Sequence, residues 1–297
     1  MKILKVILKV LLFIVIGILI ILIIDYARIN IRYLFSKKDY EEAFNIYGNK
    51  NGLVPQGLTY SEKYNVVLQT SYSKESSMVY VIDFKSGKLI KELKLINKDG
   101  TNNIKHVGGI TTDDNYVWIS NDYEIDVYNI EDIVNASSSS VKSIKEIKLP
   151  IRGDFCYYHD DILWVGDFYL KPFYDVPNGD PKLNGYKIDT EINLDKPDYV
   201  LSLPKMVQGM SILPDGSFAF TESFTYLINS NLSIYENILD KSNKFDNSNL
   251  IKTIKIPPMA EGLFSKDGYL YLLFESSSDK YSLAEPKVDK VLKYKIK

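Results

Sequence analysis

The chain has 297 residues, with 36 lysines and arginines against 38 aspartates and glutamates, and its 45% of hydrophobic residues indicates a globular protein rather than a disordered one. A single cysteine, Cys156, excludes an intrachain disulfide, and two histidines, His106 and His159, exclude a multi-histidine metal site. Residues 1–38 hold seven basic groups and one acid, which leaves 29 bases and 37 acids in the rest. This acidic body contains one arginine, Arg152, and lacks the clustered cations of nucleic-acid-binding proteins.

The first predicted element is a membrane-spanning helix. Residues 10–24 are apolar without a charge, and residues 3–24 would form a helix of about 33 Å, long enough to cross a bilayer. No small-residue cleavage site follows the apolar run, so we predict that residues 1–38 form an uncleaved signal anchor. The lysines that precede the run lie closer to it than the bases that follow, which favours a body outside the cytoplasm, on a single-pass protein of the cell membrane.

The rest of the chain, residues 39–297, repeats a pattern five times. Five segments begin alike, in most cases with a polar residue, a glycine and an apolar residue, at intervals of 52, 46, 54 and 53 residues. The units start near residues 54, 106, 152, 206 and 259. Each contains short runs rich in Val, Ile and Tyr between turn signals, and four strands in a unit of about fifty residues are typical of a propeller blade.

This repeat predicts an all-β fold, a five-bladed β-propeller of four-stranded antiparallel blades. A β-sandwich is the alternative, but it does not explain why the same two-strand pattern recurs five times. The fifth unit contains only one strand, residues 290–296, after its first two. Because a closed propeller must pair its last blade with its first, we expect residues around 43–48 to supply the missing outer strand.

Polar residues are predicted to gather at one end of the propeller axis. In an antiparallel blade the start of the first strand and the end of the second lie at the same end of the sheet. The strand-opening positions are Gln56, Gly108, Asp154, Gln208 and Glu261. The strand-ending positions are Thr70, Asn121, Asp167, Glu222 and Glu275. Five of these ten residues are acids, so the sequence predicts an acidic axial mouth that could bind a small molecule, a glycan or a protein.

The chemistry of this mouth has several interpretations. Carboxylate and amide oxygens suit Ca²⁺, and five acids without a cation would repel one another, but the same groups could bind an organic ligand or cap strand ends in water. His106, just upstream of the mouth, could act as a general base or be a structural residue. Arg152 could bind an anionic group of a ligand or pair with Asp154. Residues 171–184 are expected to form a loop that covers the mouth as a lid.

Two short segments resemble known propeller families. The segment Gln56-Gly57-Leu58-Thr59-Tyr60, with the strand and turn that follow it, resembles the first blade of plant-type glutaminyl cyclases. The segment Glu261-Gly262-Leu263 is similar to the opening of calcium-dependent lactonases of the gluconolactonase and regucalcin group. Those enzymes bind a metal through a Glu, an Asn and an Asp around the axis. The resemblance therefore implies that Glu261, Asn121 and Asp167 are metal ligands here.

These observations leave two hypotheses for the function. In the first, a membrane-anchored extracytoplasmic propeller serves as a ligand-binding or scaffold module through its acidic axial mouth. In the second, the protein is a Ca²⁺-dependent hydrolase, lactonase-like, or a lyase that acts on a small or sugar-like substrate at the same mouth, with His106 as the base. Cys156 is expected to be a small buried core residue in either case.

Overall fold

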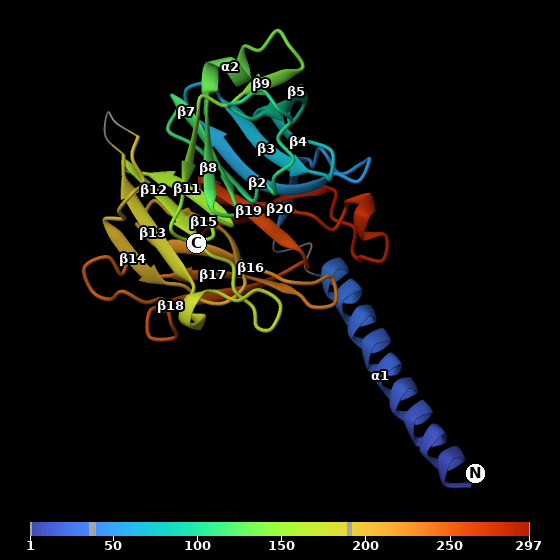
Figure 1. Ribbon diagram of the computed structural model, residues 1–297. Helices are drawn as coiled ribbons and strands as arrows, with labels where there is room; N and C mark the ends of the chain where they lie inside the picture. The colour runs from blue at the N-terminus through green and yellow to red at the C-terminus, as the bar shows by residue number, and fades with distance from the viewer. Residues whose placement is uncertain (1, 36–39, 189–191, 297) are drawn as a thin grey trace.

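Five antiparallel sheets around one axis follow a long N-terminal helix in the computed structural model, which describes residues 2–35, 40–188 and 192–296 (Figure 1). Each sheet holds four antiparallel strands, and one sheet carries a fifth strand at its edge. The prediction of a five-bladed β-propeller is therefore confirmed. The apolar core lies mainly between neighbouring sheets, where the rings of Trp118 and Trp164 are completely enclosed and Cys156 is buried.

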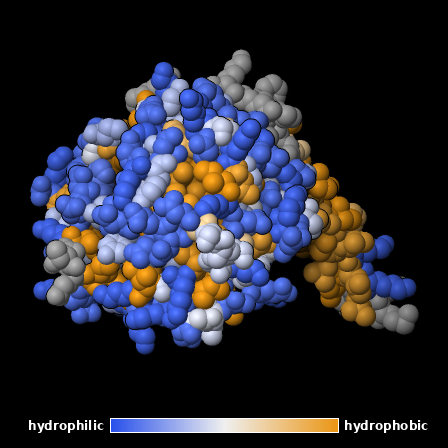
Figure 2. Space-filling view, turned by 90° about the horizontal axis from the view of Figure 1, so that it is seen from above, coloured by the Kyte–Doolittle hydropathy of each residue, from blue (hydrophilic) through white to orange (hydrophobic). Residues whose placement is uncertain are grey.

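The N-terminal helix, α1 (Lys2–Phe35), extends away from the propeller (Figure 1). Its segment Leu4–Arg28 is long and apolar enough to cross a membrane and is not buried in the protein. In Figure 2 this helix forms a continuous hydrophobic surface beside a body that is mostly hydrophilic. A helix of this form is found in secretion signals and in membrane anchors.

In the first four blades the strands follow chain order from the axis outward, except that the second blade omits β9. The first blade contains β2 (Val54–Ser61), β3 (Val66–Tyr72), β4 (Ser77–Asp83) and β5 (Leu89–Ile96). The second contains β6 (Gly109–Thr112), β7 (Tyr116–Asn121), β8 (Glu124–Asn129) and β10 (Lys145–Lys148). The third contains β11 (Phe155–His159), β12 (Ile162–Gly166), β13 (Lys182–Lys187) and β14 (Tyr199–Ser202). The fourth contains β15 (Val207–Ile212), β16 (Phe218–Glu222), β17 (Ser230–Tyr235) and β18 (Leu250–Ile256).

The fifth blade joins the two ends of the propeller. It contains β19 (Ala260–Lys266), β20 (Tyr269–Phe274), β21 (Lys290–Lys295) and, as its outer strand, β1 (Glu41–Asn45). The strand β1 runs antiparallel to β21, with Glu41 opposite Lys293 and an ion pair of 2.8 Å between their side chains. Phe44 turns inward, and its ring stacks on Tyr271 with 6.3 Å between centroids. The N-terminal strand therefore closes the ring of blades.

The connection between β8 and β10 adds a strand to the neighbouring blade. It forms the short helix α2 (Ile130–Val134) and then β9 (Ser140–Lys142), which pairs in parallel with β5 of the first blade. Val141 is buried there. This addition, which the sequence pattern does not predict, covers a sheet edge that would otherwise expose unpaired backbone groups.

Glycines at the openings of the inner strands allow these strands to crowd around the axis. A Cβ atom on Gly109 would lie 2.4 Å from the amide nitrogen of Cys156, and one on Gly262 would lie 2.6 Å from that of Leu58. The third unit has Phe155 in place of this glycine, and its ring fits over Gly166 of the neighbouring strand. The space that the inner strands leave at the axis is only about 10 Å³, so the mouth is closed at its base.

Two loops that follow second strands contain single turns of 3₁₀ helix. The loop between β12 and β13 contains η2 (Pro177–Gly179), and the loop between β20 and β21 contains η3 (Asp279–Tyr281). Because second strands end where first strands begin, these loops lie at the mouth end of the propeller. They supply several of the side chains described below.

Candidate functional site

Glu261 lies at the floor of the axial mouth, in the inner strand of the fifth blade. Its side chain is buried, with 3% of the residue exposed. Burial raises the pKa of Glu261 well above its usual range, and the carboxylates of Glu275 and Asp154 raise it further. Among the described residues, no side chain or backbone amide donates a hydrogen bond to this carboxyl group. Its ionised form is therefore uncompensated by the protein.

Glu275 connects the fifth and first blades at this floor. It follows β20, and its Oε2 accepts a hydrogen bond of 3.1 Å from Nε2 of Gln56 in β2. Burial raises the pKa of Glu275 to about 7, although its hydrogen bonds to Tyr281 and Gln56 and the charge of Lys280 act in the opposite direction. This carboxyl group therefore keeps its proton to a higher pH than an exposed glutamate does.

Asp154 is the acid that has a cationic partner. Its Oδ1 lies 3.0 Å from Nε of Arg152, and its Oδ2 accepts a hydrogen bond of 2.7 Å from the amide of Phe168. Burial nevertheless raises the pKa of Asp154 to about 7, and the nearby carboxylates of Asp167 and Asp122 contribute to this rise. One guanidinium group is not enough to hold the site fully ionised.

Asp167, at the end of β12, presents a free carboxyl oxygen. Its Oδ2 accepts a hydrogen bond of 3.1 Å from the amide of Lys182, whereas its Oδ1 is buried and has only the amide of Arg152 nearby, outside good hydrogen-bond geometry. Burial raises the pKa of Asp167 to about 6. We refer to four residues, each coupled electrostatically to another of the set, as the mouth acids: Asp154, Asp167, Glu261 and Glu275.

Aromatic and basic side chains surround the mouth acids. The ring of Tyr72 contacts His106 edge-on at 4.5 Å, and its hydroxyl lies 3.2 Å from Nζ of Lys280. Lys280 also lies over the ring of Tyr281, with 5.3 Å from Nζ to the ring centroid. Burial lowers the pKa of His106 to about 4, so its imidazole is neutral at pH 7. The rim therefore combines π faces with a neutral base.

The loop after β12 reaches over Arg152. The guanidinium of Arg152 lies 5.4 Å from the centroid of the Tyr174 ring and forms a second ion pair with Asp122, at 3.2 Å. Tyr174 in turn contacts Phe168 edge-on, with 5.2 Å between centroids. The segment that was expected to act as a lid, residues 171–184, thus covers the edge of the mouth with Tyr174 and continues into β13.

Two other residues that were predicted to line the mouth, Asn121 and Thr70, form hydrogen bonds with neighbouring parts of the chain. The Oδ1 atom of Asn121 accepts a hydrogen bond from the amide of Val107, and its Nδ2 donates to Asp126, so its oxygen is engaged within the second blade. Thr70 bridges backbone groups of Gly57 and Val107. The metal set inferred from the lactonase resemblance therefore stays a prediction, with Glu261 and Asp167 offering free oxygens and Asn121 already bonded.

Three of the ten predicted positions remain. Gln208 is half-buried and lines the narrow axial space, together with Gly108. Glu222 lies outside the mouth, in a groove between the fourth blade and α1, where its Oε2 accepts a hydrogen bond of 3.1 Å from Asn231. Burial raises the pKa of Glu222, and its Oε1 is buried without a partner.

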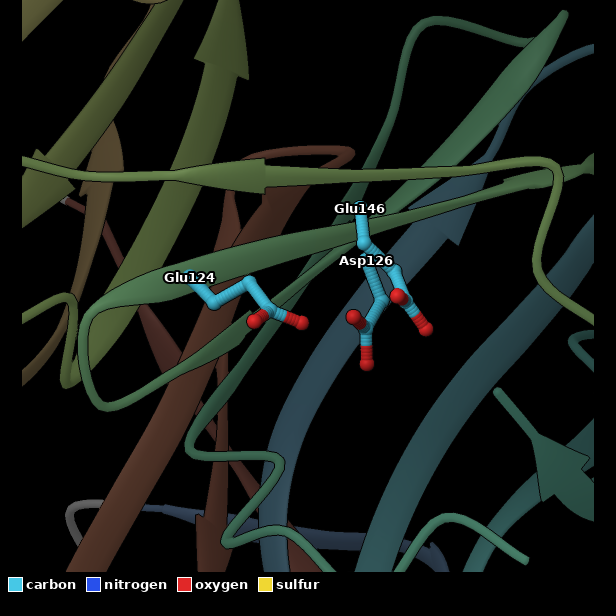
Figure 3. Close-up of side chains that lie close together, drawn as sticks. All are labelled: Glu124, Asp126 and Glu146. Atoms are coloured by element: carbon cyan, nitrogen blue, oxygen red, sulfur yellow. The ribbon is translucent and has the colours of Figure 1, made fainter. Parts of the chain in front are cut away.

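A second acidic cluster lies in the second blade. The carboxyl groups of Glu124 and Asp126 on β8 and of Glu146 on β10 converge, with oxygens within 4.8 Å of one another (Figure 3). Their geometry would suit a metal ion, but Nζ of Lys105 already bonds Glu124, lies 2.8 Å from Asp126 and lies 4.0 Å from Glu146. Burial still raises the pKa of Asp126 to about 7. Lys105 therefore makes this cluster an internal ion-pair network.

Sequence reasoning missed several residues of the mouth. Tyr72 follows the strand-ending Thr70 by two positions, and Lys280 and Tyr281 belong to a long loop without a repeat pattern. These residues could have been found from their place in the sequence, because each lies at or after the end of a second strand, and every loop that follows a second strand lies at the mouth end.

Comparisons with known proteins identify the fold only. No known protein family matches the sequence, and no curated protein matches it. Among solved structures, the glutaminyl cyclase of Myxococcus xanthus superposes with a TM-score of 0.52 at 7% identity, over 85% of this chain and 94% of that one. The PQQ-bound aldose sugar dehydrogenase of Streptomyces coelicolor gives 0.49 at 10% identity, over 86% and 96%. A luciferin-regenerating enzyme gives 0.47 at 12% identity, over 87% and 95%. At these identities the chain is similar to these propellers in fold.

Proposed function

We propose that this protein is a membrane-anchored, extracytoplasmic binding module or scaffold whose axial mouth binds a small cationic ligand, either Ca²⁺ or an organic ammonium group. One observation carries the proposal: among the described residues the four mouth acids, three of them buried, have a single ion-pair partner, Arg152, which pairs with Asp154. Buried carboxylates that lack counter-charges have raised pKa values, and a bound cation would relieve their repulsion.

The donor set fits either kind of cation. Glu261 and the Oδ1 atom of Asp167 offer oxygens that no described group occupies, and hard oxygen ligands suit Ca²⁺. The ammonium of Lys280 lies over the rings of Tyr72 and Tyr281, with Nζ 5.1 and 5.3 Å from their centroids, and an organic ammonium group of a ligand would make the same kind of contact. Arg152 is held by Asp154 and Asp122, so little of its charge remains to attract an anion.

Calorimetric titration with calcium chloride, and separately with choline, tests the proposal. Because the mouth acids are partly protonated near pH 7, binding of a cation should release protons, and the measured heat should depend on the ionisation enthalpy of the buffer. Glu261→Gln should weaken binding and reduce proton release. Glu236→Gln, an exposed change at the opposite end of a blade, should alter neither. A mouth that binds neither probe would contradict the proposal.

The membrane part of the proposal has its own test. Cys156 is buried, and burial raises the pKa of its thiol to about 12, so it should not react with maleimides in the folded protein. A Lys85→Cys variant places one reactive thiol on an exposed turn. Labelling of intact cells by a membrane-impermeant maleimide is expected for an extracytoplasmic body. Labelling only after lysis would place the body in the cytoplasm, and release by alkaline carbonate would contradict the anchor.

A Ca²⁺-dependent hydrolase or lyase is the second candidate, and His106 favours it. This imidazole borders the mouth and is neutral at pH 7, so it could accept a proton from water while Glu261 and Asp167 hold the metal. Turnover of a panel of lactones and sugar esters with calcium chloride, lost in His106→Gln while calcium binding persists, would support catalysis. Absence of turnover by the wild-type protein would favour the binding module.

A further inference from the structure

Exposed apolar side chains gather on the loops at the mouth end of the propeller. Phe173 is 69% exposed, Phe224 37%, Ile228 47% and Leu283 72%. They belong to the loops after β12, β16 and β20, the second strands of three consecutive blades. The rings of Phe173 and Phe224 stack across two blades, with 5.7 Å between centroids. Apolar groups that cluster on an exposed surface indicate a contact with a partner or a membrane.

The helix α1 reaches the same end of the propeller. Asp25 and Arg28 line a groove of about 350 Å³ together with residues of the fourth blade, including Phe224 and Ile228. Asp25 is half-buried there, whereas the apolar residues of the helix that precede it are exposed. The loop after β16 therefore lies beside the point where the apolar part of α1 ends.

This position fixes the height of the loop above a bilayer that holds α1. The apolar run ends at Ile24, so residues 25–28 extend about 6 Å beyond the hydrocarbon core, at about 1.5 Å per residue. The interfacial layer on one side of a bilayer is about 5–7 Å thick. Side chains at the level of Asp25 and Arg28 therefore lie among the lipid headgroups.

We propose that the mouth end of the propeller rests on the bilayer, with Phe173, Phe224, Ile228 and Leu283 inserted among the headgroups. The bilayer is the occupant that the chain itself brings to this surface, because α1 carries it to the edge of Phe224 and Ile228. Phe and Leu side chains of segments that lie on a bilayer surface insert to this depth. The axial mouth then opens toward the headgroup layer, from which its ligand would enter. This inference rests on the membrane anchoring stated under the proposed function.

Quenching of tryptophan by brominated lipids tests this arrangement in the full chain. The protein is reconstituted in two sets of vesicles, one of phosphatidylcholine brominated near the headgroup end of its acyl chains, for tryptophans near the headgroups, and one brominated near the chain ends, for tryptophans near the bilayer centre. Three variants each add one tryptophan: Leu12→Trp in α1, Phe224→Trp at the mouth end, and Lys85→Trp in the turn between β4 and β5, at the opposite end of a blade. The native Trp118 and Trp164 are enclosed and supply a constant background, measured in the wild-type protein.

The three variants test the membrane anchor, the contact of the mouth end with the bilayer, and the orientation of the propeller separately. Loss of most of the added emission in Leu12→Trp and Phe224→Trp, with none in Lys85→Trp, is the expected result. Quenching of Leu12→Trp alone would overturn the resting of the mouth on the bilayer and leave the anchor intact. Quenching of Lys85→Trp instead of Phe224→Trp would show the opposite orientation. No quenching of Leu12→Trp would contradict both the anchor and the inference.

Discussion

Replacing Glu275 by glutamine should stabilise the propeller at alkaline pH. Glutamine has the same shape as glutamate, and its carbonyl oxygen can still accept the hydrogen bond from Gln56. The substitution removes the ionisation of a carboxyl group whose pKa burial raises to about 7. An acid with a raised pKa in the folded state stabilises the fold at low pH, and this stabilisation is lost as the pH rises through the folded-state pKa.

The expected size follows from the two pKa values of Glu275. The shift from 4.5 in the unfolded chain to about 7 in the fold corresponds to about 3 kcal/mol at 1.36 kcal/mol for each pKa unit. Because Glu275 is partly exposed, solvent screening reduces this to about 2 kcal/mol. At pH 8 the variant should therefore melt about 4–8 °C above the wild-type protein, given the usual shift for a domain of this size. At pH 5 the two should differ little.

Thermal unfolding followed by tryptophan fluorescence measures this difference. The signal comes from the propeller, because Trp118 and Trp164 lie in its second and third blades. The full chain is melted in mild detergent with EDTA, since a bound cation would compensate the carboxylate. Glu236→Gln, an exposed change, serves as the matched control. Equal stabilisation at pH 5 and pH 8, or destabilisation at pH 8, would refute the electrostatic reasoning.

Three further predictions concern the fold. In urea unfolding, Phe44→Ala should destabilise the propeller by about 3–5 kcal/mol, as for other buried phenylalanines. The matched control Glu42→Ala, an exposed change on the same strand, should have almost no effect, and equal effects of the two would contradict the role of β1 in closing the ring of blades. Lys105→Met should destabilise the propeller by about 2–4 kcal/mol, because it leaves Asp126 buried without its cation. Adding Asp126→Asn to the same chain should restore most of this loss, and a double variant without recovery would mean that lost packing of the Lys105 side chain causes the destabilisation. Gly262→Ala should destabilise the propeller by about 1–3 kcal/mol, because the added methyl group would overpack against Leu58. Gly268→Ala, at a position with open space around it, should show only the smaller strain of its positive φ angle. An unaffected Gly262→Ala variant would mean that the inner strands separate easily.

The sequence predicts the propeller because its repeat reflects a steric requirement. Gly109 and Gly262 recur at the positions where neighbouring inner strands touch, so the spacing of these motifs reports the blade period directly. The third unit departs from the pattern, yet Phe155 is accommodated by Gly166 on the next strand, a compensation that becomes visible only in three dimensions. β9 could not be predicted for a related reason: it leaves its own blade to pair with β5, and no periodicity records such a change of partner.

The sequence could predict which residues lie at the mouth better than it could predict which partners their side chains contact. Strand register places Glu261 and Asp167 at the mouth, and both were expected from the repeat. The partner that each side chain selects depends on rotamers and loops, and Asn121 illustrates this, because its amide turns toward Asp126 rather than the axis. Lys280 and Tyr281 reach the mouth from a loop whose path no local pattern specifies.

The two acidic clusters show why the number of carboxylates does not identify a binding site. Glu124, Asp126 and Glu146 lie closer together than the mouth acids do, but the ammonium of Lys105 reaches all three. The mouth acids have one ion-pair partner among the described residues, and the pKa values of Asp154 and Glu275 rise to about 7. Raised pKa values do not distinguish the two clusters, because burial raises the pKa of Asp126 to about 7 as well. A cluster that already holds a cation gains little from a further one, whereas mouth acids that keep protons without a cation can exchange them for a ligand. The lack of counter-charge, together with the open lone pairs of Asp167 and Glu261, therefore makes the mouth the better candidate for cation binding.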